Sequence, residues 1–299
     1  MKTSLTPSHF LLALAVVAVW GSNFVVIKLA LAHMPPLLFA TLRFLLVVLP
    51  LLLLPRPKVP WRHLAAYGLL IGVGQFGLLF VAMNGHISPG LASLVIQVQV
   101  FFTIGLAVLM AGETLSRLQW LALLLAGAGL GVIALHTDGS TTPLGLGLVL
   151  LAALSWAGGN LVSRAAGRVN MVAFVVWSSL FAVPPLAALA LWLEGWDALL
   201  AGVLQADAAA WAAVVWQAWG NSIFGYAAWA WLLSRYSAAA ITPMALLVPL
   251  FGMGSSAWWL AEPLPPWKLN AAALVLAALA LNLLGPWWLR RRRANAVRS

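Results

Sequence analysis

The sequence lacks cysteine and contains few charged residues. None of its 299 residues is a cysteine, and only 7% are Asp, Glu, Lys or Arg. The lack of cysteine excludes disulfides, thiol nucleophiles and zinc–thiolate sites. Soluble domains have about a quarter of their residues charged, whereas 64% of this chain is hydrophobic and its mean hydropathy is +1.01. The composition therefore predicts an integral membrane protein without a soluble domain.

Acidic residues are the scarcest charged group. Only six Asp or Glu residues are present, and none lies in the interior of an apolar run. Glu113 and Glu262 follow such runs, where a carboxylate favours the amino terminus of the next helix. Proton-coupled pumps usually use an intramembrane carboxylate or histidine. The sequence therefore argues against this form of coupling, and against the binding of lipophilic cations by a buried carboxylate.

The motifs of enzymes and metal sites are also missing. The sequence has no H-E-x-x-H, no G-x-S-x-G and no paired-carboxylate cluster, which are patterns of metalloproteases, hydrolases and acid–base catalysts. We therefore predict no catalytic residue, no metal site and no cofactor. An intramembrane enzyme and a scaffold stay as alternative interpretations from other classes.

Long apolar runs dominate the rest of the sequence. Runs of about 20 residues are typical of membrane-spanning helices, whereas barrel strands alternate. We predict an all-α integral membrane protein with ten transmembrane helices joined by short connections. The runs cover residues 9–31, 36–54, 62–84, 89–111, 117–136, 143–163, 171–193, 209–233, 238–260 and 267–289.

The basic residues fall in alternate connections. With both termini in the cytoplasm, 13 of the 16 basic residues lie on the cytoplasmic side, and the positive-inside rule fixes that orientation. The net charge of +10 thus reflects topology, and no nucleic-acid partner is predicted. Residues 290–299 form a basic cytoplasmic tail. The 13 residues are Lys2, Arg56, Lys58, Arg62, Arg117, Arg164, Arg168, Arg235, the four arginines at 290–293 and Arg298.

The chain repeats itself. GSNFVVIK after Trp20 is echoed by AGGNLVSR after Trp156, and the segment 86–115 aligns with 235–264 at an offset of 149. The two halves, 1–136 and 137–289, hold five helices each, so the second enters the membrane from the opposite side. Inverted repeats around a central cavity are the architecture of secondary transporters, although duplication also produces scaffolds and some channels.

The motifs point to a known family. The W-G-S-N-F…K opening at 20–28, the five-plus-five arrangement, and G-E-T-L and A-E-P-L at 112–115 and 261–264 resemble the EamA branch of the drug/metabolite transporter superfamily. Within it the chain looks most like the YddG-type exporters of aromatic amino acids. The resemblance implies a bacterial inner-membrane exporter in which helices 1–4 and 6–9 enclose a cavity and helices 5 and 10 stand outside. The second half departs from the pattern, with Ala157 where the first has Gly21.

Two basic residues lie within the runs. Lys28 is close to the end of the first helix, where it either anchors in the headgroups by snorkelling or attracts a carboxylate to the pathway. Arg43 lies seven residues into the second helix, roughly 10 Å along its axis. A buried guanidinium is costly, so Arg43 either faces the cavity or a helix interface, or snorkels outward.

Amides and deep aromatic residues are the remaining cavity candidates. An amide in lipid must find hydrogen bonds, so each either joins helices or lines a wet cavity. Gln97 and Gln99 lie about 200° apart on a helix, so we expect only one, Gln97, to point inward. Most of the 17 tryptophans fit the interfacial belt, whereas deep aromatics offer a stackable wall. The candidates are Asn23, Gln75, Gln97, Asn160, Asn221, Trp20, Trp156, Trp177 and Tyr226.

Small residues and proline suggest where the helices bend or pack. Gly72, Gly77 and Pro249 are predicted hinges for rocking between the halves. Helices 5 and 10 carry small-residue stripes that either pack within their own half or form a homodimer contact. The sequence as a whole favours facilitated export of a neutral or zwitterionic metabolite, such as an aromatic amino acid. Proton-coupled multidrug efflux is the alternative among transporters.

Overall fold

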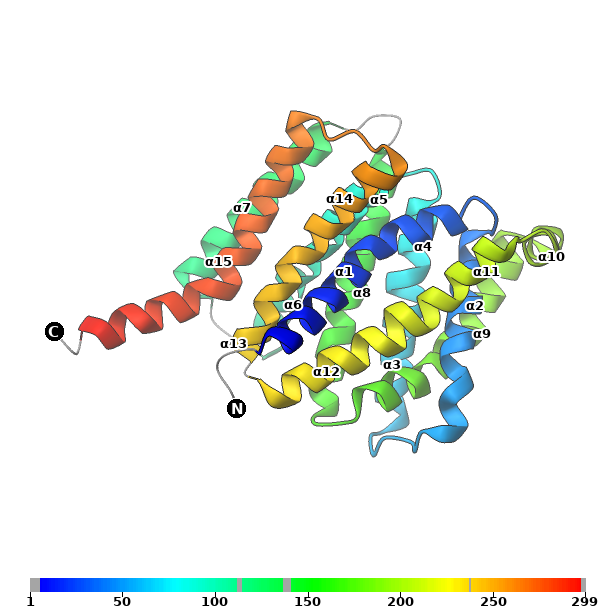
Figure 1. Ribbon diagram of the computed structural model, residues 1–299, viewed down its shortest axis with the longest axis horizontal. Coiled ribbons are helices and arrows are strands. Elements are labelled where there is room, and N and C mark those ends of the chain that lie inside the picture. Colours follow the sequence, from blue (N-terminus) through cyan, green and yellow to red (C-terminus); the bar gives the residue numbers. More distant parts are fainter. Residues whose placement is uncertain (1–5, 112–114, 137–140, 237, 297–299) are drawn as a thin grey trace.

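The computed structural model describes residues 6–111, 115–136, 141–236 and 238–296, and its regular elements in these ranges are helices (Figure 1). Nine helices are long and apolar enough to cross a membrane, and a bent pair supplies a tenth span in the described part of the chain. These ten segments match the ten apolar runs, except that the bent pair also includes residues 196–204, which lie in none of the runs. The predicted all-α membrane fold is therefore confirmed.

Five of the spans are single helices, and the other five are interrupted by 3₁₀ or π segments. The single helices are α1 (Pro7–Ala30), α7 (Arg117–Leu135), α8 (Pro143–Ala166), α9 (Met171–Leu193) and α15 (Pro266–Ala296). The interrupted spans are α2 (Pro36–Val48) with η1 (Leu49–Leu53); α3 (Trp61–Gly68), η2 (Leu69–Gly77) and α4 (Leu78–Met83); α5 (Pro89–Val95), η3 (Ile96–Val98) and α6 (Gln99–Ala111); α11 (Ala208–Val215), η4 (Trp216–Phe224) and α12 (Gly225–Arg235); and α13 (Ala238–Ile241), η5 (Thr242–Leu247) and α14 (Val248–Leu260).

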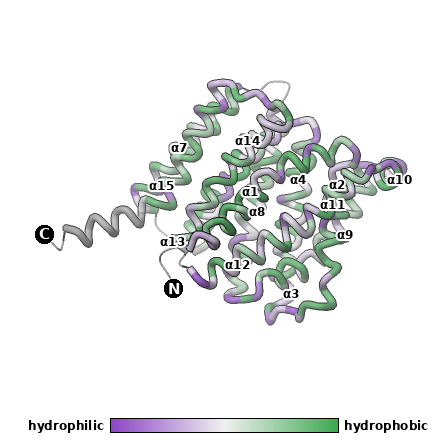
Figure 2. The backbone as a smooth tube through the Cα atoms, in the orientation of Figure 1, coloured by the Kyte–Doolittle hydropathy of each residue, from purple (hydrophilic) through white to green (hydrophobic). Residues whose placement is uncertain are grey.

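Local sequence explains where the helices begin. Proline is the first residue of α1, α2, α5, α8 and α15, because its missing N–H is not needed there and its φ suits a helix. Elsewhere a side chain caps the helix: Ser116 and Gln119 form a capping box on α7, and Asn170 accepts from two N–H groups of α9. Figure 2 shows hydrophobic residues along the helices and hydrophilic residues gathered toward their ends.

The interruptions recur in the two halves. The third and eighth spans each contain a nine-residue π-helix, η2 and η4, and the fourth and ninth spans each contain a 3₁₀ segment, η3 and η5. Single-turn π-helices are rare and occur often at functional sites. The repeat seen in the sequence is thus also a repeat of backbone irregularities.

One helix was not predicted from the sequence. The connection between the seventh and eighth runs was expected to be a loop, but residues Trp196–Leu204 form α10, which meets the eighth span at an angle of 101°. Asp207 ends the break and caps α11 by accepting from the N–H of Ala210 at 2.8 Å. The run LLAGVL at 199–204 is too short to span a membrane, so apolar runs of about 20 residues do not reveal this helix.

Helices α7 and α15 pack against each other at one edge of the molecule (Figure 1). Ala122, Ala126 and Gly129 of α7 are buried, and a Cβ on Gly129 would lie 2.8 Å from Val275. The predicted small-residue stripes therefore join the two halves within one chain. Gly131, on another face of α7, has no atom within 4 Å of its Cβ position.

The predicted hinge glycine Gly72 lies at a close helix crossing. Gly72 is in η2, and an added Cβ would overlap the Cβ of Ala182 in α9. Gly77 ends the same π-helix, and a Cβ added to it would lie 3.3 Å from the side chain of Leu186. Pro249 is the second residue of α14, directly after the 3₁₀ segment η5. All three residues lie at or beside backbone irregularities.

Two carboxylates from the second half cap helices of the first. Glu194, after α9, accepts from the N–H groups of Leu37 and Leu38 at 2.6 and 3.0 Å. Glu262, after α14, accepts from the N–H of Gly90 at 2.9 Å. The expectation that Glu262 serves the next helix was wrong, because α15 begins with a proline and the free N–H groups belong to α5. Its repeat partner Glu113 lies outside the described residues.

Candidate substrate-binding site

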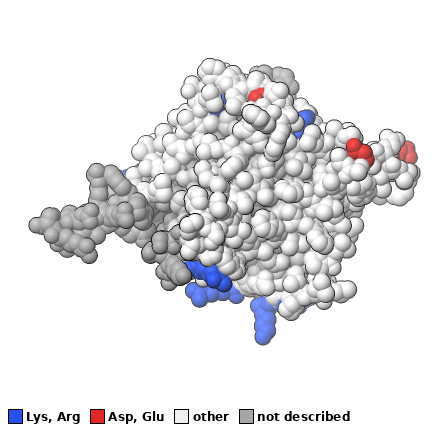
Figure 3. All heavy atoms as spheres, viewed as in Figure 1, with Lys and Arg blue, Asp and Glu red and all other residues white. Residues whose placement is uncertain are grey.

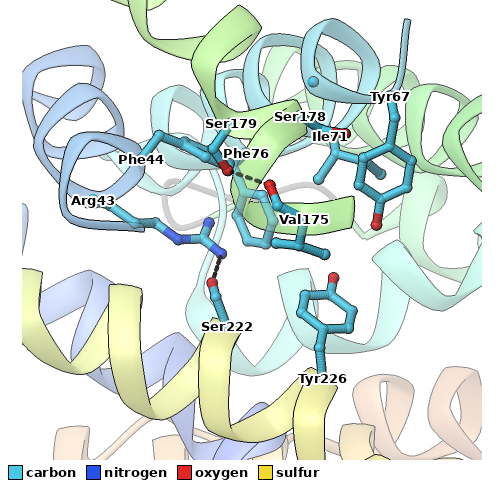
Figure 4. Close-up of a pocket in the computed structure, with 11 residues that line it drawn as sticks. Arg43, Phe44, Tyr67, Ile71, Phe76, Val175, Ser178, Ser179, Ser222 and Tyr226 are labelled. Carbon is cyan, nitrogen blue, oxygen red and sulfur yellow. Dashed lines mark hydrogen bonds between the residues drawn. The ribbon is translucent and has the colours of Figure 1, made fainter. Parts of the chain in front are cut away.

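A small cavity lies where four spans from the two halves meet (Figure 4). The second and third spans contribute from the first half, and the seventh and eighth from the second, so each wall faces its own repeat partner. The cavity has a volume of about 10 Å³, which is the space of roughly one water molecule. Its lining residues are Arg43, Phe44, Tyr67, Gly68, Ile71, Phe76, Val175, Ser178, Ser179, Ser222 and Tyr226.

Arg43 is the only charged residue of the cavity lining. Its side chain is 1% exposed, so it does not snorkel to the surface. Its Nη2 donates to the hydroxyl of Ser222 at 2.8 Å, whereas Nε and Nη1 have no hydrogen-bond partner among the described residues. The guanidinium carbon lies 3.4 Å from the centre of the Phe76 ring and 4.8 Å from that of Phe44. Aromatic faces attract such a cation, but they leave two of its nitrogens without an acceptor.

Hydroxyl groups surround the guanidinium. The phenol oxygens of Tyr67 and Tyr226 point toward each other across the cavity (Figure 4), and these are two of only three tyrosines in the chain. Ser179 donates to the carbonyl of Val175 at 2.8 Å. The hydroxyl of Ser178 is buried without a hydrogen-bond partner. The cavity thus combines one cation with hydroxyls and aromatic rings, and contains no carboxylate.

A second polar group lies between the first and eighth spans. Asn23 donates to the side-chain oxygen of Gln217 at 3.4 Å, and both residues are buried. One polar atom of each amide, and Oε1 of the buried Gln75, have no partner among the described residues. Ser222 donates to the carbonyl of Gln217 at 3.1 Å, which links this group to the cavity around Arg43.

Trp20 borders the same region. Its indole N–H donates to the backbone carbonyl of Asn221 at 3.1 Å, and its ring lies 5.9 Å from the ring of Tyr226. The side chain of Asn221 is buried. Of the candidates from sequence, Arg43 and Tyr226 line the cavity, Trp20 contacts Tyr226, and Asn23 connects to the cavity through Gln217 and Ser222.

Other candidates lie elsewhere. Asn160 of α8 donates to the side chains of Gln99 at 2.7 Å and Thr103 at 3.3 Å. Gln97 lies two residues before Gln99, in η3, and is buried. Gln99 is half-buried and is the glutamine that bonds Asn160. A larger cavity of about 130 Å³ adjoins this group, lined by Thr103, Ile104, Ala107, Val108, Leu115, Gln119 and Arg164.

Three further candidates are not at the Arg43 cavity. Trp177 donates to the carbonyl of Leu54 at 3.0 Å, near the loop between the second and third spans. Trp156 packs against the hydrophobic core. Lys28 is exposed at the end of α1.

Several cavity residues were missed from sequence. Tyr67, Ser178, Ser179 and Ser222 are single hydroxyls in apolar runs, which helices commonly tolerate through bonds to their own backbone. Gln217 is an amide in an apolar run like the other candidates, so the same signal identifies it. Among the described residues no cluster of His, Asp and Glu could hold a metal ion.

Comparisons with known proteins agree with this architecture. A model of the EamA-like transporter family matches residues 8–135 and again 143–284. The chain is 42% identical to a probable amino-acid metabolite efflux pump of Salmonella typhimurium, covering 92% of this chain and 94% of that protein. It is 39% identical to the protein of the same description from Escherichia coli K12, covering 96% and 98%.

More distant similarities are also present. A probable terminal-alkyne amino-acid exporter of Streptantibioticus cattleyicolor is 27% identical over 78% of this chain and 73% of its own. A crystal structure 19% identical in sequence superimposes with a TM-score of 0.62 over 96% of this chain and 99% of that one, which supports the fold. Since the family model covers both halves, the chain belongs to the EamA-like transporter family and is a multi-pass membrane transporter.

Proposed function

We propose that this protein exports amino acids and related metabolites, chiefly those with neutral or aromatic side chains, by alternating access. The observation that carries the proposal is the buried polar cavity around Arg43, which lies between paired spans of the two repeats. Substrate sites of inverted-repeat transporters occupy this position. The printed names of the relatives, two amino-acid metabolite efflux pumps and an amino-acid exporter, support this class of cargo.

Alternating access requires the cavity to open. Small-molecule sites have volumes of about 300–1,000 Å³, whereas this cavity has about 10 Å³, so an amino acid enters only when the surrounding spans separate. We assign the moving bodies to residues 1–136 and 137–289, with a basic tail at 290–299. Gly72, Gly77 and Pro249 are proposed hinges, because they lie where π and 3₁₀ segments interrupt the helices.

The cargo's own gradient is the proposed driving force. All six acidic residues of the chain lie outside the ten apolar runs of the sequence, and Asp197 lies in α10, before the bend that leads into α11. The proposal therefore has no carboxylate within an apolar run to carry protons. Proton-coupled efflux is the alternative that the experiment below distinguishes.

We place the protein in a bacterial inner membrane with both termini in the cytoplasm. On the face shown in Figure 3, acidic side chains lie toward the upper and right edges, and basic ones lie along the lower edge as well as near the upper one. The basic residues at the lower edge, where this face shows no acidic one, support the positive-inside orientation. Since the chain has no cysteine, single-cysteine variants report accessibility without background. Lys58→Cys should resist an impermeant maleimide in intact cells, whereas Asp197→Cys should react; the reverse pattern would invert the topology.

A homodimer through helices α7 and α15 stays a proposal. The buried face of α7 is used by α15, so a dimer would use the face that carries Gly131. Oxidative cross-linking of Gly131→Cys in membranes is expected to trap a dimer, with Lys58→Cys as the control. Absence of cross-linking at Gly131 would contradict this contact.

Counterflow in proteoliposomes tests the export function. Vesicles preloaded with unlabelled phenylalanine should accumulate external [³H]phenylalanine transiently, because an alternating-access carrier exchanges one substrate for another. Protein-free vesicles are the control. Accumulation without an imposed pH gradient supports the facilitative mechanism, accumulation only with a gradient favours proton coupling, and none with any amino acid refutes this cargo.

A further inference from the structure

The buried guanidinium of Arg43 lacks a counter-charge. The side chain is 1% exposed and lies in the middle of an apolar span. Its two free nitrogens, Nε and Nη1, are donors without acceptors among the described residues. Leaving a buried charge without a partner destabilises a protein strongly. Such a cost is expected at a site that an anion occupies during the working cycle.

The geometry around Arg43 suits a carboxylate. Nη2 gives one hydrogen to Ser222 and carries a second, so a carboxylate can bind the Nη1–Nη2 edge in bidentate fashion while Ser222 stays in place. The Phe76 ring covers the face of the guanidinium, and Nη1, at its edge, has no hydrogen-bond partner among the described residues. Across the cavity Ser178 has a buried hydroxyl without a partner, and it is a donor available to the same anion.

The site is asymmetric between the repeats. Arg43 lies seven residues after the first residue of α2 (36 to 43), and Ser178 lies seven after the first residue of α9 (171 to 178). One half therefore contributes a cation and the other a hydroxyl at equivalent places. This pairing orients an anionic group toward the first half.

The lining of this cavity offers no equivalent site for an ammonium group. The lining contains no Asp or Glu, and the six acidic residues of the sequence lie outside the ten apolar runs. An ammonium in the cavity meets only hydroxyl and carbonyl oxygens and the rings of Phe44, Tyr67, Phe76 and Tyr226. Neutral acceptors form weaker bonds than charged ones, so the amine contributes little to recognition.

We propose that Arg43 binds the carboxylate of the cargo and that the amine is not selected, so aromatic monocarboxylates with an acylated or missing amino group are substrates alongside amino acids. This inference rests on the proposed function for the direction of transport but is tested by binding alone. Arg43 acts as the specificity-determining residue, and the aromatic rings around it receive the apolar part of the cargo.

Three ligands separate the two ends of the cargo. Isothermal titration of the full chain in nanodiscs measures binding of phenylalanine, N-acetylphenylalanine, which lacks the ammonium, and phenylalanine methyl ester, which lacks the carboxylate. We expect N-acetylphenylalanine to bind within about threefold of phenylalanine, and the ester at least about tenfold more weakly, since hydrogen bonds to charged groups are worth that much or more.

Substitution of Arg43 assigns the preference to this residue. In Arg43→Met and Arg43→Gln the ratio of the ester's dissociation constant to the acid's should fall toward one, whereas the exposed Arg62→Met should keep the wild-type ratio. The unliganded Arg43→Met protein should unfold at or above the wild-type midpoint, because methionine removes an unpaired buried charge. A purely structural arginine that joins α2 to η4 predicts a lower midpoint.

The outcomes separate this inference from the export function. Equal binding of acid and ester by the wild type, or a ratio above tenfold retained in both Arg43 variants, would overturn carboxylate recognition even where counterflow of phenylalanine succeeds. Tight, Arg43-dependent binding of N-acetylphenylalanine without any counterflow would support the inference and reject the transport proposal. Absence of binding of all three ligands to the wild type would overturn it.

Discussion

Removal of either partner of the Glu262–Lys268 ion pair should destabilise the protein, and Glu262 should be the more important. Lys268 and Glu262 are 2% and 6% exposed, with their charged atoms 3.1 Å apart. Glu262 also accepts from the hydroxyl of Ser88 at 2.5 Å and the N–H of Gly90 at 2.9 Å. It therefore holds α5 of the first half to the α14–α15 connection of the second.

The magnitudes follow from what each substitution leaves behind. Glu262→Gln leaves a buried ammonium without a counter-charge, with the amide oxygen and the Ser88 hydroxyl at 3.4 Å as neutral acceptors, and breaking one side of a buried pair costs about 3–5 kcal/mol. Lys268→Met leaves Glu262 with two donors and the positive end of a helix, which is worth about 0.3–1 kcal/mol. We expect Lys268→Met to cost about 1–2 kcal/mol less than Glu262→Gln. The double variant should be no less stable than Glu262→Gln alone. The double-mutant cycle should therefore give a coupling energy between Glu262 and Lys268 of about 1 kcal/mol or more.

Reversible unfolding in mixed dodecyl maltoside–SDS micelles, followed by circular dichroism, measures these differences. Lys58→Met serves as the control, because Lys58 is an exposed cation and its loss should change stability by less than about 0.5 kcal/mol. A Lys268 variant less stable than the Glu262 variant, or additive single substitutions, would refute the reasoning that Glu262 is the centre of this contact.

Three further effects are expected. Gly72→Val should lower stability by about 1–3 kcal/mol in the same assay, because the valine side chain would overlap Ala182. The control Gly131→Ala should be neutral, and equal effects of the two substitutions would contradict the close crossing of η2 and α9 at Gly72. Burial raises the pKa of Glu194 above its ordinary value, although two backbone N–H groups oppose this. The folded state therefore binds more protons than the unfolded state, and the free energy of unfolding should fall as pH rises from about 4.5 through the raised pKa. This pH dependence should vanish in Glu194→Gln, and an unchanged dependence would assign it to another group. Counterflow of phenylalanine should be unaffected by collapse of a pH gradient, measured with a protonophore; inhibition would indicate coupling that no carboxylate within the spans explains.

The positions of the spans could be read from sequence because hydrocarbon imposes one requirement on each. A backbone crossing the membrane must satisfy its own hydrogen bonds and present apolar side chains, so the ten runs, their prolines and their basic flanks are local signals. The bent α10 segment escaped notice because LLAGVL at 199–204 is too short to meet that requirement. The π and 3₁₀ segments escaped for a different reason, since they depend on the neighbouring helices.

The candidate site was only partly predictable. Asn23, Arg43 and Tyr226 were found because polar and aromatic groups stand out in apolar runs. Ser178 does not stand out, because a serine in a helix commonly bonds its own backbone. Only the folded structure shows that its hydroxyl is buried without a partner. Trp177 lies outside the lining of this cavity, because depth along a helix does not determine which face a side chain occupies.

The relation between symmetry and chemistry is the most informative feature of the site. The two halves share their π-helices and 3₁₀ segments, so the irregular backbone beside the cavity is repeated in both. A cargo with a carboxylate at one end and an aromatic ring at the other has no such symmetry. If both α2 and α9 carried an arginine facing the cavity, two guanidinium groups would repel each other in a low-dielectric space. One arginine opposite one serine avoids that repulsion, and under the proposed carboxylate recognition it gives the cargo a single orientation between two repeated backbones.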